Sequence, residues 1–216
     1  MIKIITISDT HNRHYELSKD LASLITDYEN TIVLHAGDIT MQGKTKEIVS
    51  FLTWFGNLKC RYKCFIAGNH DWAFEDNHEI APMFQDMGIV YLMDKMVELN
   101  GIKIYGSPWQ PRFNDWAFNV DRGAAIAKKW ETIPQGMDIV MTHGPLYGIL
   151  DNTYAGLRVG CEELYKKIVE VKPRYHVCGH VHHSYGTKIM DGTTFVNASS
   201  LGESYRYRNK PISFYL

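Results

Sequence analysis

The stretch Ile2-Lys3-Ile4-Ile5-Thr6-Ile7-Ser8-Asp9-Thr10-His11 decides the fold class. Its first six residues are rich in β-branched isoleucine, which is typical of a strand. Asp9 and His11 follow at the end of this strand, two residues apart, so both side chains can point the same way. Side chains that can bind a ligand, placed where a strand ends, are typical of α/β proteins. The stretch therefore predicts a first strand over 2–7 that ends in two side chains able to bind a ligand.

Four further clusters repeat this arrangement, each after an apolar run that predicts a strand. They are Gly37-Asp38 after 32–35, Gly68-Asn69-His70-Asp71 after 64–67, Thr142-His143-Gly144-Pro145 after 139–141, and Gly179-His180-Val181-His182 after 175–178. One cluster alone would indicate little, because a Gly-Asp pair is commonly a turn and a lone histidine commonly packs in a core. Five such clusters in one chain indicate a centre for two metal ions.

The segments between the clusters predict alternating strands and helices. Strands over 2–7, 31–35 and 62–67 are separated by apolar patterns of helical period over 14–28 and 44–58, which favours parallel pairing with crossover helices. Two further helices are expected over 121–132 and 161–171. Shorter strands are expected over 89–92, 96–99, 102–105, 138–142, 174–178, 185–190, 193–197 and 211–216.

Two dipeptides and the lack of breaks complete the predicted architecture. Asn100-Gly101 and Asp191-Gly192 are each expected to form a hairpin turn, the first of type I′. No repeat or linker interrupts the sequence, so we expect a single domain over 1–216. The expected fold class is α/β, with two mixed β-sheets packed together and flanked by helices.

Composition points to an ordinary globular protein. The chain has 216 residues, 45% hydrophobic and 22% charged, with a formal net charge of -1. No basic stripe predicts a nucleic-acid groove, and no apolar run approaches the ~20 residues that a membrane span needs. Met1 leads directly into the first strand without a signal peptide, so we expect a cytoplasmic protein.

Cysteine spacing allows two interpretations. Cys60 and Cys64 stand four residues apart, and a zinc knuckle would need a second pair to complete it. Cys161 and Cys178 do not form such a pair. We expect all four to be buried free thiols in a reducing compartment.

The chemistry of the clusters suits a pair of metal ions. Two ions about 3.5–4 Å apart need a bridging ligand together with nitrogen and hard oxygen ligands. Asp38 is the natural bridge, because each carboxylate oxygen can bind one ion. Asn69 offers an amide oxygen, His143 offers an imidazole, and His180 and His182 repeat the spacing of the first pair. Such a set accepts Mn, Fe, Zn, Co or Ni, and manganese is the ion of choice for an assay.

In their order along the chain, the motifs D-x-H, G-D, G-N-H-D, T-H-G and G-H-x-H resemble the calcineurin-like metallophosphoesterase superfamily, from residue 5 to about residue 200. A narrower similarity, to the metallophosphoesterase-domain-containing group, is carried by 35–38, 66–70, 106–111, 113–119, 148–151, 159–164 and 195–200. Studied members of that group hydrolyse phosphodiesters, including 2′,3′-cyclic and 3′,5′-cyclic nucleotides.

The resemblance implies a four-layer α/β/β/α sandwich and a division of the ligands between two metal sites. One metal would be held by Asp9, His11, Asp38 and His182, and the other by Asp38, Asn69, His143 and His180. His70 would not be a ligand but would face the substrate phosphate. Attack by a metal-bridging hydroxide is then expected, with His70 and Asp38 as the catalytic residues and His70 placed to protonate the leaving oxygen.

Residues near these motifs are candidates for holding the substrate. Asn69 and His70 would contact the phosphate. The aromatic segment 109–118 could stack Trp109 and Trp116 on a base while Arg112 pairs with phosphate, or it could be a loop packed by its own aromatic rings. Asp71 could orient His70 or cap the helix that follows.

The resemblance also shows a departure that bears on the substrate. Protein Ser/Thr phosphatases of the superfamily carry arginines after the G-D and G-N-H motifs that hold a phosphomonoester. Here Ile39-Thr40-Met41 follows Asp38, and Asp71-Trp72-Ala73 follows His70. A monoanionic diester demands less positive charge, so the sequence favours a binuclear phosphodiesterase acting on a small diester, a cyclic nucleotide being one candidate.

Two alternatives stay open. One is a broad-specificity phosphomonoesterase that uses the same metals, and the other is a nucleotide-binding regulator with weak activity. The expected partner is the small phosphodiester or nucleotide substrate, with no nucleic-acid or membrane partner and with a homodimer left open.

Overall fold

The computed structural model describes residues 1–76 and 87–216, and within them the longer strands form two large mixed sheets. The first sheet has the order β13 (Ile212–Tyr215), β1 (Lys3–Ile7), β2 (Thr31–Ala36), β3 (Tyr62–Ile66) and β4 (Ile89–Tyr91). Strands β1 to β4 run parallel, and β13 pairs antiparallel with β1. The crossovers between β1, β2 and β3 are the predicted β-α-β-α-β run.

The second sheet is built from the later part of the chain. Its order is β11 (Gly186–Met190), β12 (Thr193–Asn197), β10 (Tyr175–Cys178), β9 (Ile139–Thr142), β6 (Ile102–Ser107) and β5 (Lys95–Leu99). The four central strands are parallel, and β11 and β5 form antiparallel edges. A separate two-residue pair, β7 (Gln110–Pro111) with β8 (Asn119–Val120), brackets the aromatic segment.

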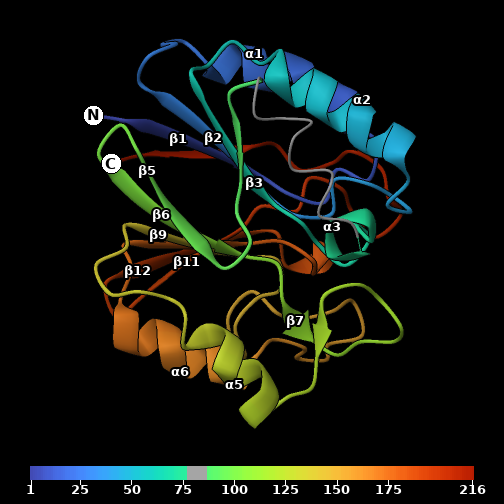
Figure 1. Cartoon of the computed structure of the whole chain (residues 1–216), viewed down its shortest axis with the longest axis vertical. Helices are drawn as coiled ribbons and strands as arrows, with labels where there is room; N and C mark the ends of the chain where they lie inside the picture. The colour runs from blue at the N-terminus through green and yellow to red at the C-terminus, as the bar shows by residue number, and fades with distance from the viewer. Residues whose placement is uncertain (77–86) are drawn as a thin grey trace.

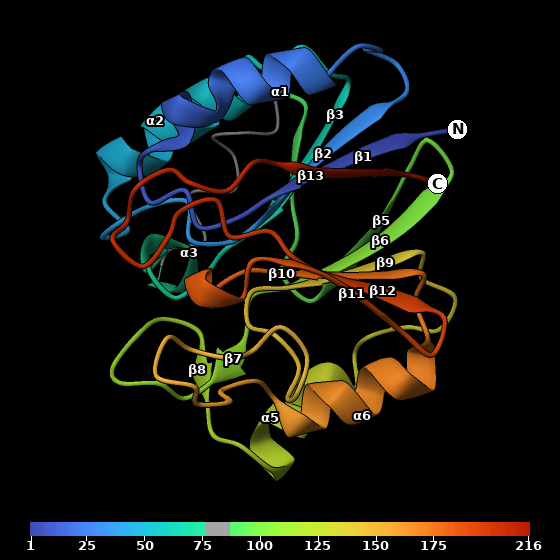
Figure 2. The ribbon, with the colours of Figure 1, turned by 180° about the vertical axis from the view of Figure 1, so that it is seen from behind.

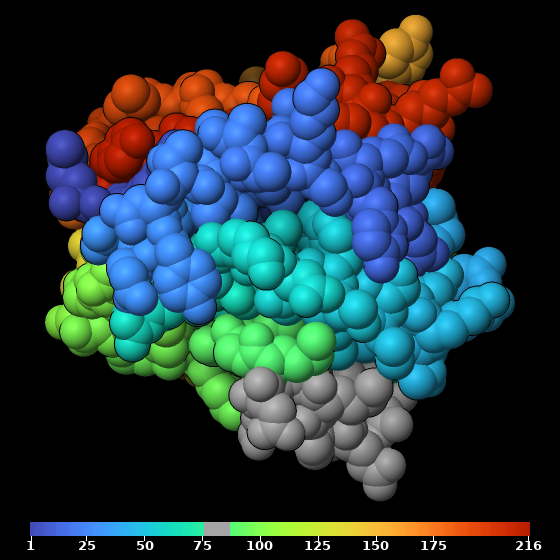
Figure 3. Space-filling model, turned by 90° about the horizontal axis from the view of Figure 1, so that it is seen from above, coloured from blue at the N-terminus to red at the C-terminus, as the bar shows by residue number. Residues whose placement is uncertain are grey.

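Helices cover the outer face of each sheet. Helices α1 (Ser18–Leu24) and α2 (Thr45–Gly56) lie over the first sheet, and α5 (Ala124–Trp130) and α6 (Glu162–Val171) lie over the second (Figure 1). The view from behind shows the same succession of helix, sheet, sheet and helix (Figure 2). Seen from above, the blue to cyan N-terminal part occupies the middle of the face, with orange to red C-terminal atoms along one edge (Figure 3). The predicted α/β/β/α sandwich is confirmed.

Three apolar layers hold the sandwich together. Between the sheets, Ile32 and Ile66 of the first pack with Ile104 and Met141 of the second. The outer layers are centred on the aromatic rings of α2 and on the apolar face of α6. Fully burying one such side chain contributes roughly 1.5–3 kcal/mol, so the strands, and the loops at their ends, rest on rigid supports.

Most of the predicted elements are found with shifted ends. The helix predicted over 14–28 is a short 3-10 helix, His14–Leu17, followed by α1, which ends at Leu24. The reason is Asp27, whose carboxylate accepts hydrogen bonds from the backbone N–H groups of Glu29 and Asn30 and so stabilises a turn instead.

Several local predictions are confirmed. Both residues of Asn100-Gly101 have positive φ, 50° and 81°, and those of Asp191-Gly192 have 50° and 85°, as a type I′ turn requires. All four cysteines are free and buried. Within residues 1–76 and 87–216, no helix combines the length and apolar character that a membrane crossing requires.

Candidate metal centre

The seven predicted ligands come together where parallel strands of both sheets end. Loops after β1, β2 and β3 supply ligands from the first sheet, and loops after β9 and β10 supply them from the second. Backbone hydrogen bonds join neighbouring loops, from Asp9 N to the Gly37 carbonyl and from Gly179 N to the His143 carbonyl, each 2.9 Å long. Parallel pairing puts these strand ends on the same edge, which explains the convergence.

Asp38 lies between two groups of ligands. Its Oδ2 is 3.5 Å from His11 Nε2, and its Oδ1 is 3.4 Å from His143 Nε2. On the first side, His182 Nε2 is 3.5 Å from Asp9 Oδ1. The two carboxylate oxygens of Asp38 therefore face different ligand groups, as a bridging ligand would.

Asn69 completes the second group. Its Oδ1 lies 3.0 Å from His143 Nε2 and 2.8 Å from His180 Nδ1. The potential ligand atoms of Asp38, His143 and His180 all lie within 4.8 Å of one another. Asp9, His11 and His182 form a second such triple, and His11, Asp38 and His70 a third.

The state of the imidazoles shows that these residues fit divalent metal ions. The Nδ1 atoms of His11, His143 and His182 lie 3.1, 2.9 and 3.2 Å from the carbonyl oxygens of Thr40, Ala36 and Gly202. Only a protonated Nδ1 can donate to a carbonyl, so the neutral form of each ring turns the electron pair of Nε2 toward the centre. Burial works to lower the pKa of His143 and of His182, but Asp38 and Asp9 respectively outweigh it and raise the pKa to about 9 and about 8. These two rings would therefore release a proton on binding a metal. His11 Nε2 is buried and has no hydrogen-bond partner. A metal ion bound to this nitrogen would satisfy it.

The backbone of the ligand loops is strained. Asp9, His11, Asp38 and His180 have φ values of 52°, 39°, 55° and 67°. Non-glycine residues in this left-handed region are uncommon and cost on the order of 1–3 kcal/mol each. Such strain is stored at functional sites, where the surrounding structure enforces it, and here it aims the ligand side chains at one point.

Glycines make room for the carboxylates. A Cβ atom at Gly68 would collide with Asp38 Oδ1 and lie 2.6 Å from His143 Cε1, and one at Gly179 would collide with Asp9 Oδ2. Gly37, with φ of 97°, has the same close approach to His143. These positions accept only glycine because the ligand side chains occupy the space that a side chain would need.

Electrostatics prepare the site for cations. Burial by itself would raise the pKa of Asp38, but the nearby His143 outweighs burial and holds the pKa well below its ordinary value. A similar balance lowers the pKa of Asp9. Burial lowers the pKa of His11 and of His180 to about 4. The carboxylates are therefore anionic and these two imidazoles neutral at pH 7, which is the state in which each binds a metal.

The structure gives Asp71 contacts that neither interpretation of the sequence anticipated. Its carboxylate accepts hydrogen bonds from the backbone N–H groups of Ile39, Thr40 and Gly68 and from the Thr40 hydroxyl. It thus ties the loop after β2 to the loop after β3, which leads into α3 (Ala73–Asp76). The ring of His70 is oriented by the Met41 carbonyl, 2.8 Å from Nδ1.

The structure brings only some of the predicted substrate residues to the centre. Trp116 lies against His70, with ring centroids 4.3 Å apart. The indole of Trp109 instead donates to Asp94, 2.8 Å away, and packs against core residues with Lys129 over its face. Arg112 lines the neighbouring cavity, but its Nε donates to Asp121 at 2.6 Å.

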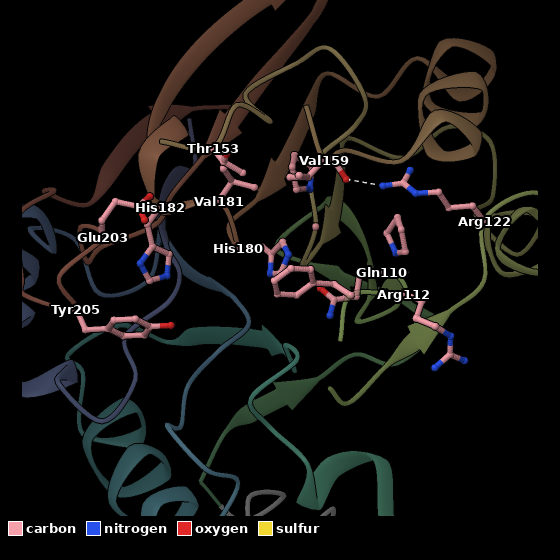
Figure 4. A pocket seen from close by; sticks show the side chains of 14 residues that line it. Gln110, Arg112, Arg122, Thr153, Val159, His180, Val181, His182, Glu203 and Tyr205 are labelled. Atoms are coloured by element: carbon pink, nitrogen blue, oxygen red, sulfur yellow. Dashed lines mark hydrogen bonds between the residues drawn. The ribbon is translucent and has the colours of Figure 1, made fainter. Parts of the chain in front are cut away.

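A cavity of about 260 Å³ opens beside the predicted metal ligands (Figure 4). His180 and His182 form part of its wall, and the remaining wall combines apolar side chains with a few polar groups; it is lined by Gln110, Pro111, Arg112, Phe113, Arg122, Gly144, Pro145, Thr153, Val159, Val181, Glu203 and Tyr205. Aromatic and apolar walls with a few polar groups are typical of small-molecule sites.

Tyr205 is the main residue of this site that sequence reasoning missed. Its ring lies 4.9 Å from the His11 ring and 5.2 Å from the His182 ring, measured between centroids, and Figure 4 shows it beside His182. It has a φ of 55°, and its carbonyl accepts a hydrogen bond from Arg13. Nothing in the surrounding sequence marks it, because the loop after Gly202 reaches the centre only through the fold.

Comparison with known proteins agrees with this geometry. Residues 2–184 match the calcineurin-like phosphoesterase family. Metallophosphoesterase domain-containing protein 1 of Homo sapiens is 37% identical over 97% of this chain and 69% of its own length. A UPF0046 protein of Caenorhabditis elegans is 34% identical over 99% of this chain and 80% of its own.

Solved structures show the same fold at much lower identity. Phosphopantetheinyl hydrolase from Mycobacterium tuberculosis aligns with a TM-score of 0.64 and 16% identity, over 94% of this chain and 90% of the other. The protein TT1561 of Thermus thermophilus aligns with the same TM-score and 13% identity, over 91% and 88% of the two chains. Chain, site and relatives together place this protein in the calcineurin-like metallophosphoesterase family, whose members hydrolyse phosphoric esters with divalent metals.

Proposed function

We propose that this protein is a binuclear metal-dependent phosphodiesterase acting on a small diester, with a nucleotide as its candidate substrate. The observation that carries the proposal is the cavity beside His180 and His182. A phosphomonoester has one organic group on phosphorus and a diester has two. A cavity of about 260 Å³, with apolar as well as polar walls and directly beside the predicted ligands, offers a place for one of these groups while the phosphate lies over the ligands.

The charge around the ligands supports a diester as well. Within the described residues, the ion pairs of Asp9 and Asp38 are all with histidines. The two arginines that line the cavity are engaged elsewhere, Arg112 with Asp121 and Arg122 with the carbonyls of Val159 and Gly160. A dianionic monoester is bound most tightly where two arginine side chains are free to pair with its phosphate. Among the described residues that line this cavity, neither arginine is free in this way.

We assign the metal sites by the two ligand groups. One would be formed by Asp9, His11, Asp38 and His182, and the other by Asp38, Asn69, His143 and His180. When bound, such ions supply a water of lowered pKa and offset the negative charge that develops on the phosphoryl oxygens. The mixed nitrogen and oxygen ligands accept Mn, Fe, Zn, Co or Ni, and we choose manganese for assay.

His70 is the proposed general acid. Its Nδ1–H is held by the Met41 carbonyl and its backbone N–H donates to Asp38 Oδ1 at 2.9 Å. The remaining Nε2 is the atom left to carry a proton to the leaving oxygen of the ester. Asn69 and His70 would together face the phosphate, because both lie in the loop that follows β3.

The test uses p-nitrophenyl phosphate and bis-p-nitrophenyl phosphate with manganese-loaded protein. We expect kcat/KM to be at least about tenfold higher for the diester, and two metal ions per chain by elemental analysis. Asp38→Asn should lower bound metal and nearly abolish turnover while the circular dichroism spectrum is kept. Faster hydrolysis of the monoester would identify a phosphomonoesterase, and nucleotide binding without hydrolysis of either ester would identify a regulator.

A cytoplasmic location is also proposed. The four cysteines are buried as free thiols, which suits a reducing compartment. Cell fractionation of the native protein tests this location, and recovery from an oxidising compartment would contradict it.

A further inference from the structure

Gln110 stands out among the residues that line the cavity. It is 1% exposed, and both polar atoms of its amide, Oε1 and Nε2, are buried without a hydrogen-bond partner. Among the described residues, it alone has two such atoms. A buried polar atom without a partner costs roughly 1–3 kcal/mol, so a fold that keeps two of them on one side chain calls for an explanation.

The backbone of Gln110 is well satisfied, so the amide alone lacks partners. Its N–H donates to the Phe118 carbonyl at 3.0 Å, and β7 pairs with β8 at this residue. The neighbouring Trp109 is anchored to Asp94. The backbone that carries the side chain is therefore held in place, and the amide has not been left without partners by local disorder of the strand pair.

The amide belongs to the cavity that adjoins the metal ligands. Gln110 and His180 line the same cavity, and Figure 4 shows the Gln110 side chain extending toward His180. Phe113 also lines this cavity; it is 52% exposed, and its ring is edge-on to His180 with centroids 6.2 Å apart. An amide beside an aromatic ring can bind a planar ligand, because the amide hydrogen-bonds to its edge and the ring stacks on its face.

We propose that Gln110 is the specificity-determining residue for the base of a nucleotide substrate and that it favours adenine. An amide places one donor beside one acceptor in a single plane. The adenine edge carries the complementary pair, an amino donor beside a ring nitrogen acceptor, and glutamine pairs with it through two hydrogen bonds. The three flexible torsions of glutamine turn the amide toward a base that enters, and Phe113 stacks on its face.

The size of the cavity agrees with this assignment. A volume of about 260 Å³ is smaller than the roughly 300–1,000 Å³ of sites that enclose a drug-sized ligand. It suits one planar ring system, with the sugar and phosphate lying outside, over the metal ligands. The inference rests on the proposed nucleotide phosphodiesterase function for its substrate, but base recognition can be measured without turnover.

The experiment compares two nucleotides that differ by one group. Adenosine 5′-monophosphate and purine riboside 5′-monophosphate, which lacks the 6-amino group, are titrated into manganese-loaded protein by calorimetry. We expect the wild type to bind the adenine nucleotide about tenfold more tightly or better. In Gln110→Leu the ratio of the two dissociation constants should fall to about one. Gln135→Leu, a change at an exposed glutamine away from the cavity, should keep the wild-type ratio.

Stability gives a second readout. Since both amide atoms are unpaired in the free protein, Gln110→Leu should unfold at the same temperature as the wild type or higher; if it unfolds lower, Gln110→Met replaces it in the titrations. The assignment would be overturned if the wild type bound both nucleotides with equal affinity. It would also be overturned if Gln110→Leu kept the wild-type ratio of the two dissociation constants. If the base is discriminated but bis-p-nitrophenyl phosphate is not hydrolysed, the phosphodiesterase function fails and the role of Gln110 stands.

Discussion

The indole of Trp116 lies against the imidazole of His70, with ring centroids 4.3 Å apart and planes tilted by 31°. His70 is thus held on two sides, by this ring and by the Met41 carbonyl at Nδ1. The loop that carries Trp116 is tied to the ligand loop, since Ala117 N donates to the Asn69 carbonyl at 3.2 Å. The aromatic segment therefore contacts the proposed general acid directly.

This contact changes what Trp116→Ala is expected to do. Base stacking alone would raise KM for cyclic nucleotides and spare a small nitrophenyl diester. Because the ring supports His70, we expect kcat to fall by roughly tenfold or more with both substrates. Trp116→Phe keeps an aromatic ring and should lose less. Steady-state kinetics on both diesters provide the measurement, and a change confined to KM for the nucleotide would show that the ring only binds the base.

Replacing His70 by alanine separates proton transfer from metal binding. A general acid typically contributes about 10²–10⁴-fold in rate, mostly when the leaving group is a poor one. We expect His70→Ala to keep both metal ions and to lose far more kcat with an alkyl diester than with a nitrophenyl diester. An equal deficit for both leaving groups would argue against the acid role. Loss of one metal ion would instead make His70 a ligand, as its closeness to His11 and Asp38 permits.

Two neighbouring glycines offer a matched pair of substitutions. A Cβ atom at Gly68 would collide with Asp38, whereas one at Gly144 would meet only Gln110 Cβ, at an ordinary 3.6 Å. Gly68→Ala should therefore displace the bridging carboxylate and reduce bound metal well below two ions per chain. Gly144→Ala should retain its metal. Elemental analysis after dialysis measures both, and full occupancy in Gly68→Ala would show that the two ligand loops can shift together.

Acid stability should depend on His14. Burial lowers its pKa from 6.5 to about 4, and its ring packs beside Phe51 and Trp54. Between these pH values the unfolded chain takes up a proton that the folded protein does not, so the free energy of unfolding falls as pH falls from about 6.5 to 4. His14→Phe removes this contribution, about 1–3 kcal/mol in full.

Urea unfolding of metal-free protein at several pH values is the measurement. The stability of His14→Phe relative to the wild type should improve steadily as the pH is lowered across that interval. A difference that stays constant with pH would mean that His14 takes up its proton equally readily in the folded protein and in the unfolded chain.

The sequence by itself determined the strands, the order of the layers and the polar clusters at the strand ends. Runs such as Ile2 to Ile7 are apolar over the full length of a strand, and Asn100-Gly101 forms its turn through backbone preferences that reside in those two residues. Such features depend on residues that are neighbours in the sequence, so the sequence of a short segment is enough to predict them. The early end of α1 was missed because the Asp27 side chain accepts hydrogen bonds from the backbone N–H groups of Glu29 and Asn30. The helical spacing of apolar residues does not reveal such side-chain bonds.

Only the tertiary structure decided which polar groups meet. Nothing in the local sequence separates Trp109 from Trp116, yet one indole is bound to Asp94 and the other lies on His70. Asp71 binds a loop about thirty residues earlier in the chain, Tyr205 covers ligands from both sheets, and the amide of Gln110 is left without a partner. Each of these outcomes depends on the relative placement of loops from two sheets, which is fixed by packing across the whole core, so a pattern within one segment does not contain it.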